Sequence, residues 1–451
     1  MPNFKKLAKG YEKDAVLALQ KFVRINSVYD ESSIGPGKPY GAGVKKALDY
    51  FAKLGEDFGF KVRNIDGHAV ELEVGEEGSP LIGIYGHSDV VPVSGTWEVP
   101  PFSATLKDGK IIGRGALDDK GPLTASLFAV KLLKDNGLIK GYRVKIVSGG
   151  DEERGSSCLK YYFEKGHGET PRFGITPDAN WPLIYAEKGI THGKLTKTIG
   201  LDPIIAMDGG VVANAVCDSL LVSLKPDEKF AKYLKENKID CDINSSKELL
   251  LVRFAGKTAH GSTPELGLSA AKVAFETIGR YYKNEFLSKL ATIFDNNGKT
   301  FQGYSHSKEL GDSTYNFGLI KYGDQKLTLS VDFRYGEEAK PEESLKNLSS
   351  YVGMDFISES VAPYLLYDKK SPLVSTLMKA YKRETMRFFD KPLAIGGGTY
   401  AKEAPNTVAF GAEWDSRPGG MHSPNEHMIV KDFIQDIAIY ARAIYMLGKV
   451  K

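Results

Sequence analysis

The sequence is poor in cysteine. Its 451 residues include three cysteines, Cys158, Cys217 and Cys241, and no CxxC pair. A small, odd number of cysteines does not make a disulfide framework, and it is typical of a protein from a reducing compartment. We therefore interpret all three as structural thiols and expect the protein to stay in the cytoplasm.

Long hydrophobic runs and an excess of one charge are also missing. No stretch approaches a membrane-spanning length, and the N-terminal residues have no apolar core of a secretory signal. Lys and Arg number 60 against 57 Asp and Glu, with no long block of like charge. These absences argue against a membrane or a nucleic acid as partner and favour a small molecule.

Three common catalytic motifs are absent as well. The sequences Gly41-Ala42-Gly43 and Gly113-Arg114-Gly115 lack the third glycine of a dinucleotide-binding loop. No GxxxxGK[ST] and no GxSxG occurs anywhere in the chain. Nucleotide chemistry and serine hydrolysis are therefore excluded.

The apolar pattern predicts two kinds of domain, because the chain is longer than one hydrophobic core usually supports. Strand-like runs at 81–85 and 142–147 flank a helical pattern at 124–134, which indicates an α/β sheet. After about Gly193, β-prone runs and helical patterns indicate an inserted α+β domain. Helical patterns at 373–385 and 430–447 then resume the first domain. We expect residues 1–190 and 369–451 to form one domain and 191–368 the insert.

Histidines and carboxylates gather in five short motifs. His87 and Asp89 follow one predicted strand, and Glu152-Glu153 follow another. The remaining motifs are Asp118-Asp119, Thr176-Pro177-Asp178 and Met421-His422-Ser423. Adjacent carboxylates repel each other unless one of them binds a cation. Each motif alone also fits a solvated loop, a charged turn or a helix N-cap. Two metal ions, however, account for all five at once.

A two-metal centre also has a clear chemistry. Two divalent ions about 3.5 to 4 Å apart polarise a carbonyl and lower the pKa of a shared water toward about 7, so that a nearby glutamate can deprotonate it. Mixed histidine and carboxylate ligands fit Zn²⁺ best, and Mn²⁺ or Co²⁺ fit the same oxygen-rich set. The sequence therefore predicts a two-metal hydrolase.

The order of the motifs resembles the dinuclear-metal aminoacylase, carboxypeptidase and dipeptidase superfamily, and within it the bacterial dipeptidase V group. The motifs that carry the resemblance are GHSDVVP, GRGALDDKGP, GGDEERGSS, TPDANWPLIYAEKG, GGVVANAV, GKTAHGSTPELG, VDFRY, GGGTYAKEAPNTVAFG and GMHSPNEH. They cover nearly the whole chain. The resemblance implies a catalytic α/β sandwich domain with a mixed sheet and an inserted α+β lid domain.

The resemblance also implies a role for each residue of the cluster. It makes Asp118 the ligand that bridges the two metals and Glu152 the general base, with Asp89 orienting His87. The peptide bond between Asp118 and Asp119 is expected to be cis. The remaining metal ligands are His87 and Asp178 on one ion, and Glu153 and His422 on the other.

Further roles implied by the resemblance lie mostly in the insert. His260 resembles the histidine that stabilises the oxyanion, and Asn214 and Arg334 resemble residues that hold the substrate backbone and its terminal carboxylate. Gly397 and Gly398 are expected to offer backbone N–H groups near the product carboxylate. Taken without the resemblance, His260 and Arg334 fit an ordinary loop histidine and an ordinary strand arginine.

These roles imply a metal-dependent dipeptidase that hydrolyses dipeptides with a free N-terminus. A monomer is expected, because the insert is longer than the dimerisation domain of two-subunit relatives. The alternative is an N-acyl amino acid deacylase or desuccinylase with the same two-metal centre. A third hypothesis is a non-catalytic binding protein that has kept the fold.

Overall fold

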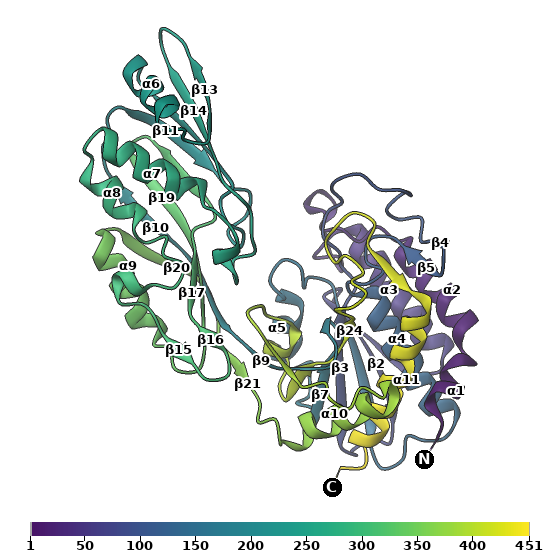
Figure 1. Cartoon of the computed structure of the whole chain (residues 1–451). Helices are drawn as coiled ribbons and strands as arrows, with labels where there is room; N and C mark the ends of the chain where they lie inside the picture. Colours follow the sequence, from purple (N-terminus) through teal and green to yellow (C-terminus); the bar gives the residue numbers. More distant parts are fainter. Residues whose placement is uncertain (1, 451) are drawn as a thin grey trace. The chain divides into compact units, whose positions relative to one another are not determined.

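The computed structural model describes residues 2–450, and the chain divides into two compact units (Figure 1). Unit 1 contains the residues up to 185, residues 367–393 and those from 399 onward. Unit 2 contains residues 186–366 and 394–398. The predicted ranges 1–190, 191–368 and 369–451 leave 394–398 with the first domain. In the structure this short segment groups with unit 2, where Ile395 O accepts a hydrogen bond from Lys188 N.

Unit 1 is built on a mixed sheet. Its strands lie in the order β1 (Lys61–Ile65), β2 (Ala69–Gly75), β6 (Arg143–Gly149), β3 (Leu81–His87), β7 (Phe173–Thr176) and β23 (Thr407–Ala409). The pairs β1–β2 and β2–β6 are antiparallel, and the pairs from β6 to β23 are parallel. Strands β3 and β6 are buried along their whole length. The continuous apolar run of β3 predicts this burial, whereas β6 also buries Arg143 and Lys145.

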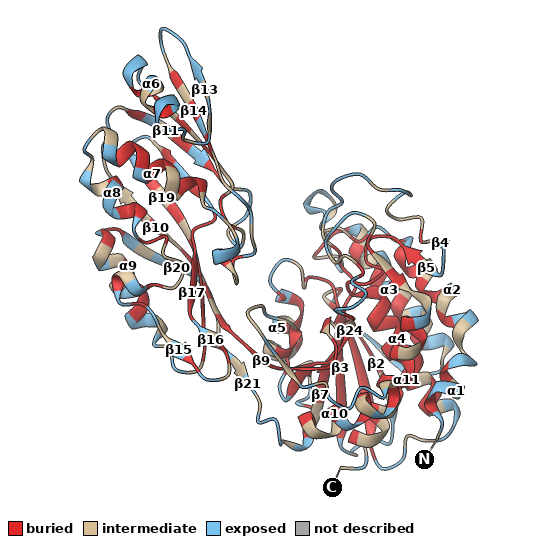
Figure 2. Ribbon diagram, in the orientation of Figure 1, coloured by how far each residue is buried: buried red, intermediate tan, exposed pale blue. Residues whose placement is uncertain are grey.

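Helices complete unit 1. They are α1 (Phe4–Lys9), α2 (Glu12–Val23), α3 (Ala42–Asp57), α4 (Lys120–Asp135), α5 (Ser157–Glu164), α10 (Pro372–Thr385) and α11 (Val430–Leu447). Helices α4 and α11 pack against each other, and Figure 2 shows how much of both is buried. The mixed sheet and its helices confirm the predicted α/β class for this part of the chain.

Two small sheets of unit 1 join distant segments. Strand β25 (His427–Ile429) pairs with β5 (Lys110–Ile112), which pairs with β4 (Thr105–Lys107). Strand β24 (Ala412–Glu413) pairs with β8 (Ala179–Asn180). The C-terminal segment therefore lies beside loops from the first half of the chain.

Unit 2 holds an antiparallel sheet. Its strands run in the order β13 (Cys241–Ser245), β14 (Leu250–Ala255), β12 (Ser219–Leu224), β11 (Ile204–Gly209), β18 (Ile320–Gly323), β19 (Lys326–Tyr335), β10 (Gly189–Thr198) and β20 (Asp355–Ala362). Helix α7 (Ala270–Tyr281) packs on β12 and β14 and against α8 (Glu285–Ala291) (Figure 1). Strand β12 alternates between buried and partly exposed residues, because only one face of the sheet meets the core. The α+β class predicted for the insert is confirmed.

Among residues 2–450, no helix has both the length and the apolar character that a membrane crossing requires.

Candidate metal centre

Three parallel strands of unit 1 end at the same place. His87 is the last residue of β3, Glu152 and Glu153 follow the end of β6 at Gly149, and Asp178 follows the end of β7 at Thr176. The carboxyl ends of neighbouring parallel strands meet at one edge of a sheet, where ligands usually bind. The strand order therefore brings side chains together that are far apart in the sequence.

Asp118 and His422 reach this edge by other routes. Asp118 lies on the loop between β5 and α4, and His422 lies a few residues before β25. Because β25 pairs with β5, with His427 opposite Ile112, the two loops lie side by side. The peptide bond between Asp118 and Asp119 is cis, as expected.

The two histidines share one carboxylate. His87 Nε2 lies 3.0 Å from Asp118 Oδ1 and 3.6 Å from Asp178 Oδ2. His422 Nε2 lies 2.7 Å from Asp118 Oδ2 and 3.2 Å from Glu153 Oε2. The carboxylate of Asp118 therefore stands between the two imidazoles with one oxygen facing each.

This donor set fits divalent metal ions. Ligand bonds of about 2.1 Å in a tetrahedral site separate neighbouring donor atoms by about 3.4 Å, close to the distances between these side chains. Ligand atoms of His87, Asp118 and Glu153 lie within 4.8 Å of one another, and so do those of His87, Glu152 and Asp178. Glu153 Oε1 is buried without a hydrogen-bond partner, although buried polar atoms are normally satisfied. A cation would satisfy it.

Asp89 supports the cluster in two ways. Its backbone oxygen lies 3.1 Å from His87 Nδ1 and its Oδ1 lies 3.4 Å away, which leaves Nε2 to face the other carboxylates. The same carboxylate accepts hydrogen bonds from the backbone N–H groups of Glu152, at 3.1 Å, and Glu153, at 3.2 Å. Asp89 thus contacts both a histidine of the cluster and the turn that carries the two glutamates.

Sequence reasoning gave no role to Glu426, which joins two of the loops. The side chain is fully buried, and Oε1 accepts from the N–H groups of Leu117, at 2.9 Å, and Asp118, at 3.1 Å. Its Oε2 accepts from Arg114 Nη1 at 2.6 Å, and Arg114 Nη2 donates to His422 O at 3.2 Å. The sequence feature that could have indicated this pair is a glutamate inside GMHSPNEH and an arginine inside GRGALDD, the two motifs that contain His422 and Asp118.

Comparison with known families identifies the protein family that has this arrangement. The sequence model of peptidase family M20/M25/M40 matches residues 83–446, a span that includes His87, Asp118, Glu152 and His422. The chain belongs to this peptidase family. It is therefore a hydrolase that acts on peptide bonds, and the resemblance that the motifs indicated is confirmed.

Relatives of this M20 peptidase match it over almost their full lengths. It is 33% identical to "Putative dipeptidase YtjP" of Bacillus subtilis over 460 residues, which cover 97% of this chain and 98% of the relative. It is 31% identical to "Putative dipeptidase SH1171" of Staphylococcus haemolyticus, with 98% and 99% covered.

Solved structures with the same fold include two dipeptidases. Human carnosine dipeptidase 1 has a TM-score of 0.59 at 15% identity and covers 100% of both chains. The dipeptidase Dug1p of Saccharomyces cerevisiae has a TM-score of 0.61 at 15% identity, with 99% of this chain and 98% of that chain covered. At such low identity, these likenesses show the fold of the M20 peptidase.

Burial and neighbouring charges shift the protonation of the cluster. Burial raises the pKa of Glu152 well above its usual range. The charge of His87 opposes this shift, and the charges of nearby carboxylates add to it. Burial, followed by the charge of Asp118, raises the pKa of Glu153 to about 7. Hydrogen bonds to Asp118 and then to Glu153 raise the pKa of His422 to about 11. In the metal-free protein, Glu152 therefore holds a proton well above the usual pH range of a glutamate.

The pKa of Asp118 moves in the opposite direction. Burial by itself would raise it, but hydrogen bonds from His422 and His87 outweigh burial and lower the pKa below its usual range. Asp118 therefore stays ionised between two imidazoles, the protonation state that a bridging ligand needs.

The other predicted residues belong to unit 2. His260 Nδ1 lies 2.7 Å from Ser262 Oγ, and Gly261 N donates to Asn214 O at 2.7 Å, so the loops of His260 and Asn214 are adjacent. Arg334 lies near the segment with Gly397 and Gly398, because its Nη1 donates to Gly396 O at 2.7 Å. The structure thus brings these predicted residues together as neighbours within unit 2.

Arg334 has a partner that sequence reasoning missed. Asp332 is fully buried and accepts from Arg334 Nε at 3.1 Å and from Nη2 at 3.0 Å. Both side chains stand on the same face of β19, because residues two apart on a strand point the same way. With these contacts and Gly396 O, Arg334 retains one further N–H on each of Nη1 and Nη2.

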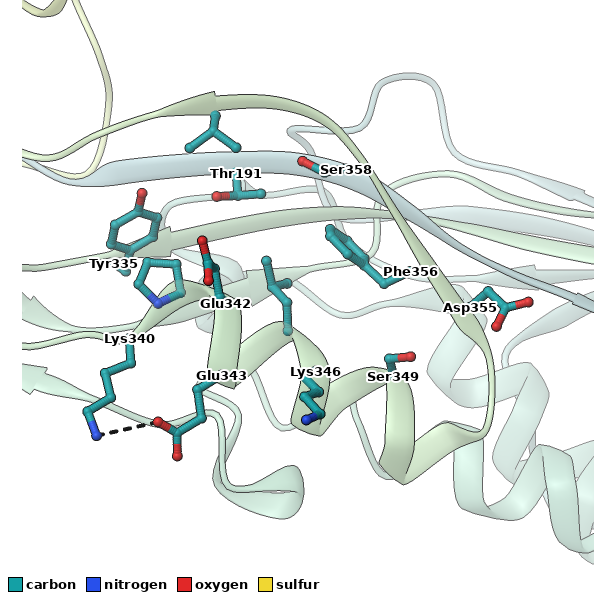
Figure 3. A pocket seen from close by; sticks show the side chains of 13 residues that line it. Thr191, Tyr335, Lys340, Glu342, Glu343, Lys346, Ser349, Asp355, Phe356 and Ser358 are labelled. Carbon is teal, nitrogen blue, oxygen red and sulfur yellow. Dashed lines mark ion pairs between the residues drawn. The ribbon is translucent and has the colours of Figure 1, made fainter.

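A cavity of about 960 Å³ lies in another part of unit 2, between α9 (Pro341–Val352) and β20 (Figure 3). Tyr335 and Phe356 line it together with charged side chains of α9, and Lys340 pairs with Glu343 at 3.4 Å. Its lining residues include no histidine, so this cavity lacks the ligand type found at the cluster of unit 1. Size alone does not identify the reactive site.

Proposed function

We propose that this M20 peptidase is a metal-dependent dipeptidase that hydrolyses dipeptides with a free N-terminus. The observation that carries the proposal is the cluster in which the buried carboxylate of Asp118 stands between buried His87 and half-exposed His422, with Glu152 at its side. The names of the bacterial relatives, which match over nearly their whole lengths, support the substrate class.

The metal ligands in this proposal are the predicted ones. His87 and Asp178 would hold one ion and His422 and Glu153 the other, with Asp118 between the two. The mixed nitrogen and oxygen donors suit Zn²⁺ best and also accept Mn²⁺ or Co²⁺. When bound, such ions polarise a peptide carbonyl and make a water molecule acidic.

Glu152 moves the proton. It takes a proton from the attacking water and returns it to the leaving amine, as a general base that then acts as a general acid. A glutamate that is efficient in both steps needs a pKa near the working pH, above that of an exposed glutamate. The burial of Glu152 supplies a shift in this direction. Asp89 accepts a hydrogen bond from the backbone N–H of Glu152 and so fixes the backbone position from which the Glu152 side chain extends.

Residues of unit 2 would bind the substrate. His260 would stabilise the oxyanion that forms at the scissile carbonyl, and Asn214 would hold the substrate backbone. The remaining N–H groups of Arg334, with the backbone N–H groups of Gly397 and Gly398, suit the terminal carboxylate. A site that captures both a free amine and a terminal carboxylate selects by length, which favours dipeptides.

Free cysteines support the proposed compartment. Cys158, Cys217 and Cys241 are all unpaired thiols, and the first two are buried. This is the cysteine use of a protein from a reducing compartment, and we place the enzyme in the cytoplasm. We also propose that it acts as a monomer, which sedimentation at micromolar concentration would test.

Glu152→Gln is the decisive test of the mechanism. The variant should bind two metal ions per chain, while kcat on a dipeptide falls about 100- to 10,000-fold, the usual contribution of a general base. Glu56→Gln makes the same chemical change at an exposed position of helix α3 and should leave kcat unchanged. Activity of Glu152→Gln close to that of the wild type would remove its role as the base.

A substrate panel tests the reaction class. Metal-stripped protein would be reloaded with Zn²⁺, Mn²⁺ or Co²⁺ in turn and offered dipeptides, tripeptides and N-acyl amino acids. Metal-dependent cleavage of dipeptides alone is the expected result. Cleavage of acylated substrates alone would instead indicate a deacylase, and metal binding without any turnover would indicate a binding protein.

A further inference from the structure

A chain of hydrogen bonds leads from a histidine near the surface to the turn that carries Glu152 and Glu153. His68 Nδ1 lies 2.7 Å from the hydroxyl of Tyr40, and this hydroxyl lies 2.9 Å from Ser157 Oγ. Ser157 Oγ donates to Asp151 Oδ2 at 2.5 Å. These residues come from four segments of unit 1: the β1–β2 turn, the residues before α3, the first turn of α5, and the residues after β6.

The chemistry of the four groups gives this chain one direction. The hydroxyl of Ser157 donates to the carboxylate of Asp151, so the single proton of Ser157 points at Asp151. Because the proton of Ser157 is used, Ser157 Oγ can only accept a hydrogen bond from Tyr40. The single hydroxyl proton of Tyr40 must therefore point at Ser157. The Tyr40 oxygen is left to accept, so His68 must carry its proton on Nδ1.

The segments joined by this chain are tied to the turn by backbone hydrogen bonds as well. Gly150 N donates to His68 O at 3.1 Å, and Ser156 N donates to Asp151 O at 2.7 Å. The ring of His68 stacks on Tyr161, with centroids 3.9 Å apart and planes 9° from parallel. His68 is therefore held on two sides, and the turn has contacts at its outer end as well as those that Asp89 makes at its inner end.

We infer that Tyr40, Ser157 and His68 are positioning residues of this peptidase: their one-way chain of donors fixes the Asp151 carboxylate and thereby the turn that presents Glu152 and Glu153. The inference rests on the proposed function for the role of these glutamates. The direction of the chain does not depend on it.

The tautomer of His68 tests the chain without measuring activity. Nitrogen NMR of histidine-labelled protein, with and without Zn²⁺ at about pH 8, should show the His68 proton on Nδ1, because this pH lies well above the pKa of a free imidazole. Tyr40→Phe should abolish this fixed tautomer. Tyr161→Phe keeps the stacked ring and loses only the hydroxyl that donates to Asp66, so the tautomer should persist. A wild-type proton on Nε2 would overturn the inference.

Kinetics test the positioning. In the Zn²⁺-loaded enzyme, Tyr40→Phe and Ser157→Ala should each lower kcat on a dipeptide about 3- to 10-fold, the range expected for one lost hydrogen bond. KM should not change. The double variant should be no slower than either single variant, because both break the same chain. Ser157→Thr keeps the hydroxyl and should restore kcat.

Tyr50→Phe is the matched control, since the Tyr50 hydroxyl donates to Ala18 O at 2.9 Å outside the chain. Wild-type kcat in Tyr40→Phe, or an equal loss in Tyr50→Phe, would overturn the positioning role. If the wild type cleaves no dipeptide, the proposed function fails, and the His68 tautomer still decides whether the chain exists.

Discussion

Replacing Glu426 by glutamine takes one negative charge out of a position with no solvent exposure. The glutamine oxygen can still accept from Leu117 N and Asp118 N, but its amide group then faces the guanidinium of Arg114. Arg114 is itself 1% exposed and loses its counter-charge. Breaking a buried ion pair from one side costs about 3 to 5 kcal/mol.

This loss should be visible in two assays. The free energy of unfolding of the metal-free protein, from urea titration, should fall by about 3 to 5 kcal/mol, and Tm by roughly 3 to 9 °C. Zn²⁺ affinity should also fall, because Arg114 and Glu426 together connect the loops of Asp118 and His422. The double variant Arg114→Met with Glu426→Gln leaves no unpaired charge and should be more stable than Glu426→Gln alone.

Glu384→Gln provides the control. Glu384 is paired with Arg442 between α10 and α11, helices that carry none of the cluster residues. This variant should lose stability and keep Zn²⁺ affinity. The reasoning is refuted if Glu426→Gln loses less than about 1 kcal/mol, the scale of one ordinary hydrogen bond. An equal loss of Zn²⁺ affinity in both variants would also refute it.

Two further predictions concern metal binding and turnover. Zn²⁺ affinity, measured against a chelator, should rise about tenfold or more per pH unit between about pH 6 and 8. The reason is that the metal must displace the proton of His422, whose pKa is raised to about 11. An affinity that does not change with pH would contradict this protonation state. His260→Ala should lower kcat about 100- to 1,000-fold, the usual cost of one oxyanion donor, and keep both metals. Metal loss in that variant would mean that His260 supports metal binding, and it would contradict the proposed role at the oxyanion.

Local patterns predicted the parts of this protein that depend on local physics. The 3.6-residue periodicity of 430–447 gave helix α11 with its observed ends, and the apolar run 81–85 gave most of β3. Carboxylates and histidines placed directly after such strands predicted the convergence of His87 and Glu153, since parallel strands align their carboxyl ends.

Long-range pairing explains what was missed. Glu426 gains its partners only because β25 pairs with β5, and no local pattern indicates that Ile112 faces His427. The grouping of 394–398 with unit 2 likewise depends on contacts with Lys188 and Arg334. The pair of Asp332 and Arg334 was within reach, because residues two apart on a strand share a face.

The segment 394–398 has a consequence for how such an insert can be exchanged between proteins. The ends of the insert are adjacent, with Ala186 opposite Leu366 in paired strands β9 (Ile184–Glu187) and β21 (Leu365–Leu366). A short turn could therefore close the gap if 186–366 were cut out. Such a deletion would also remove the donors to Ile395 O and Gly396 O, and the loop of Gly397 and Gly398 would lose its support. Transferring the insert to another protein therefore requires two segments, 186–366 and 394–398.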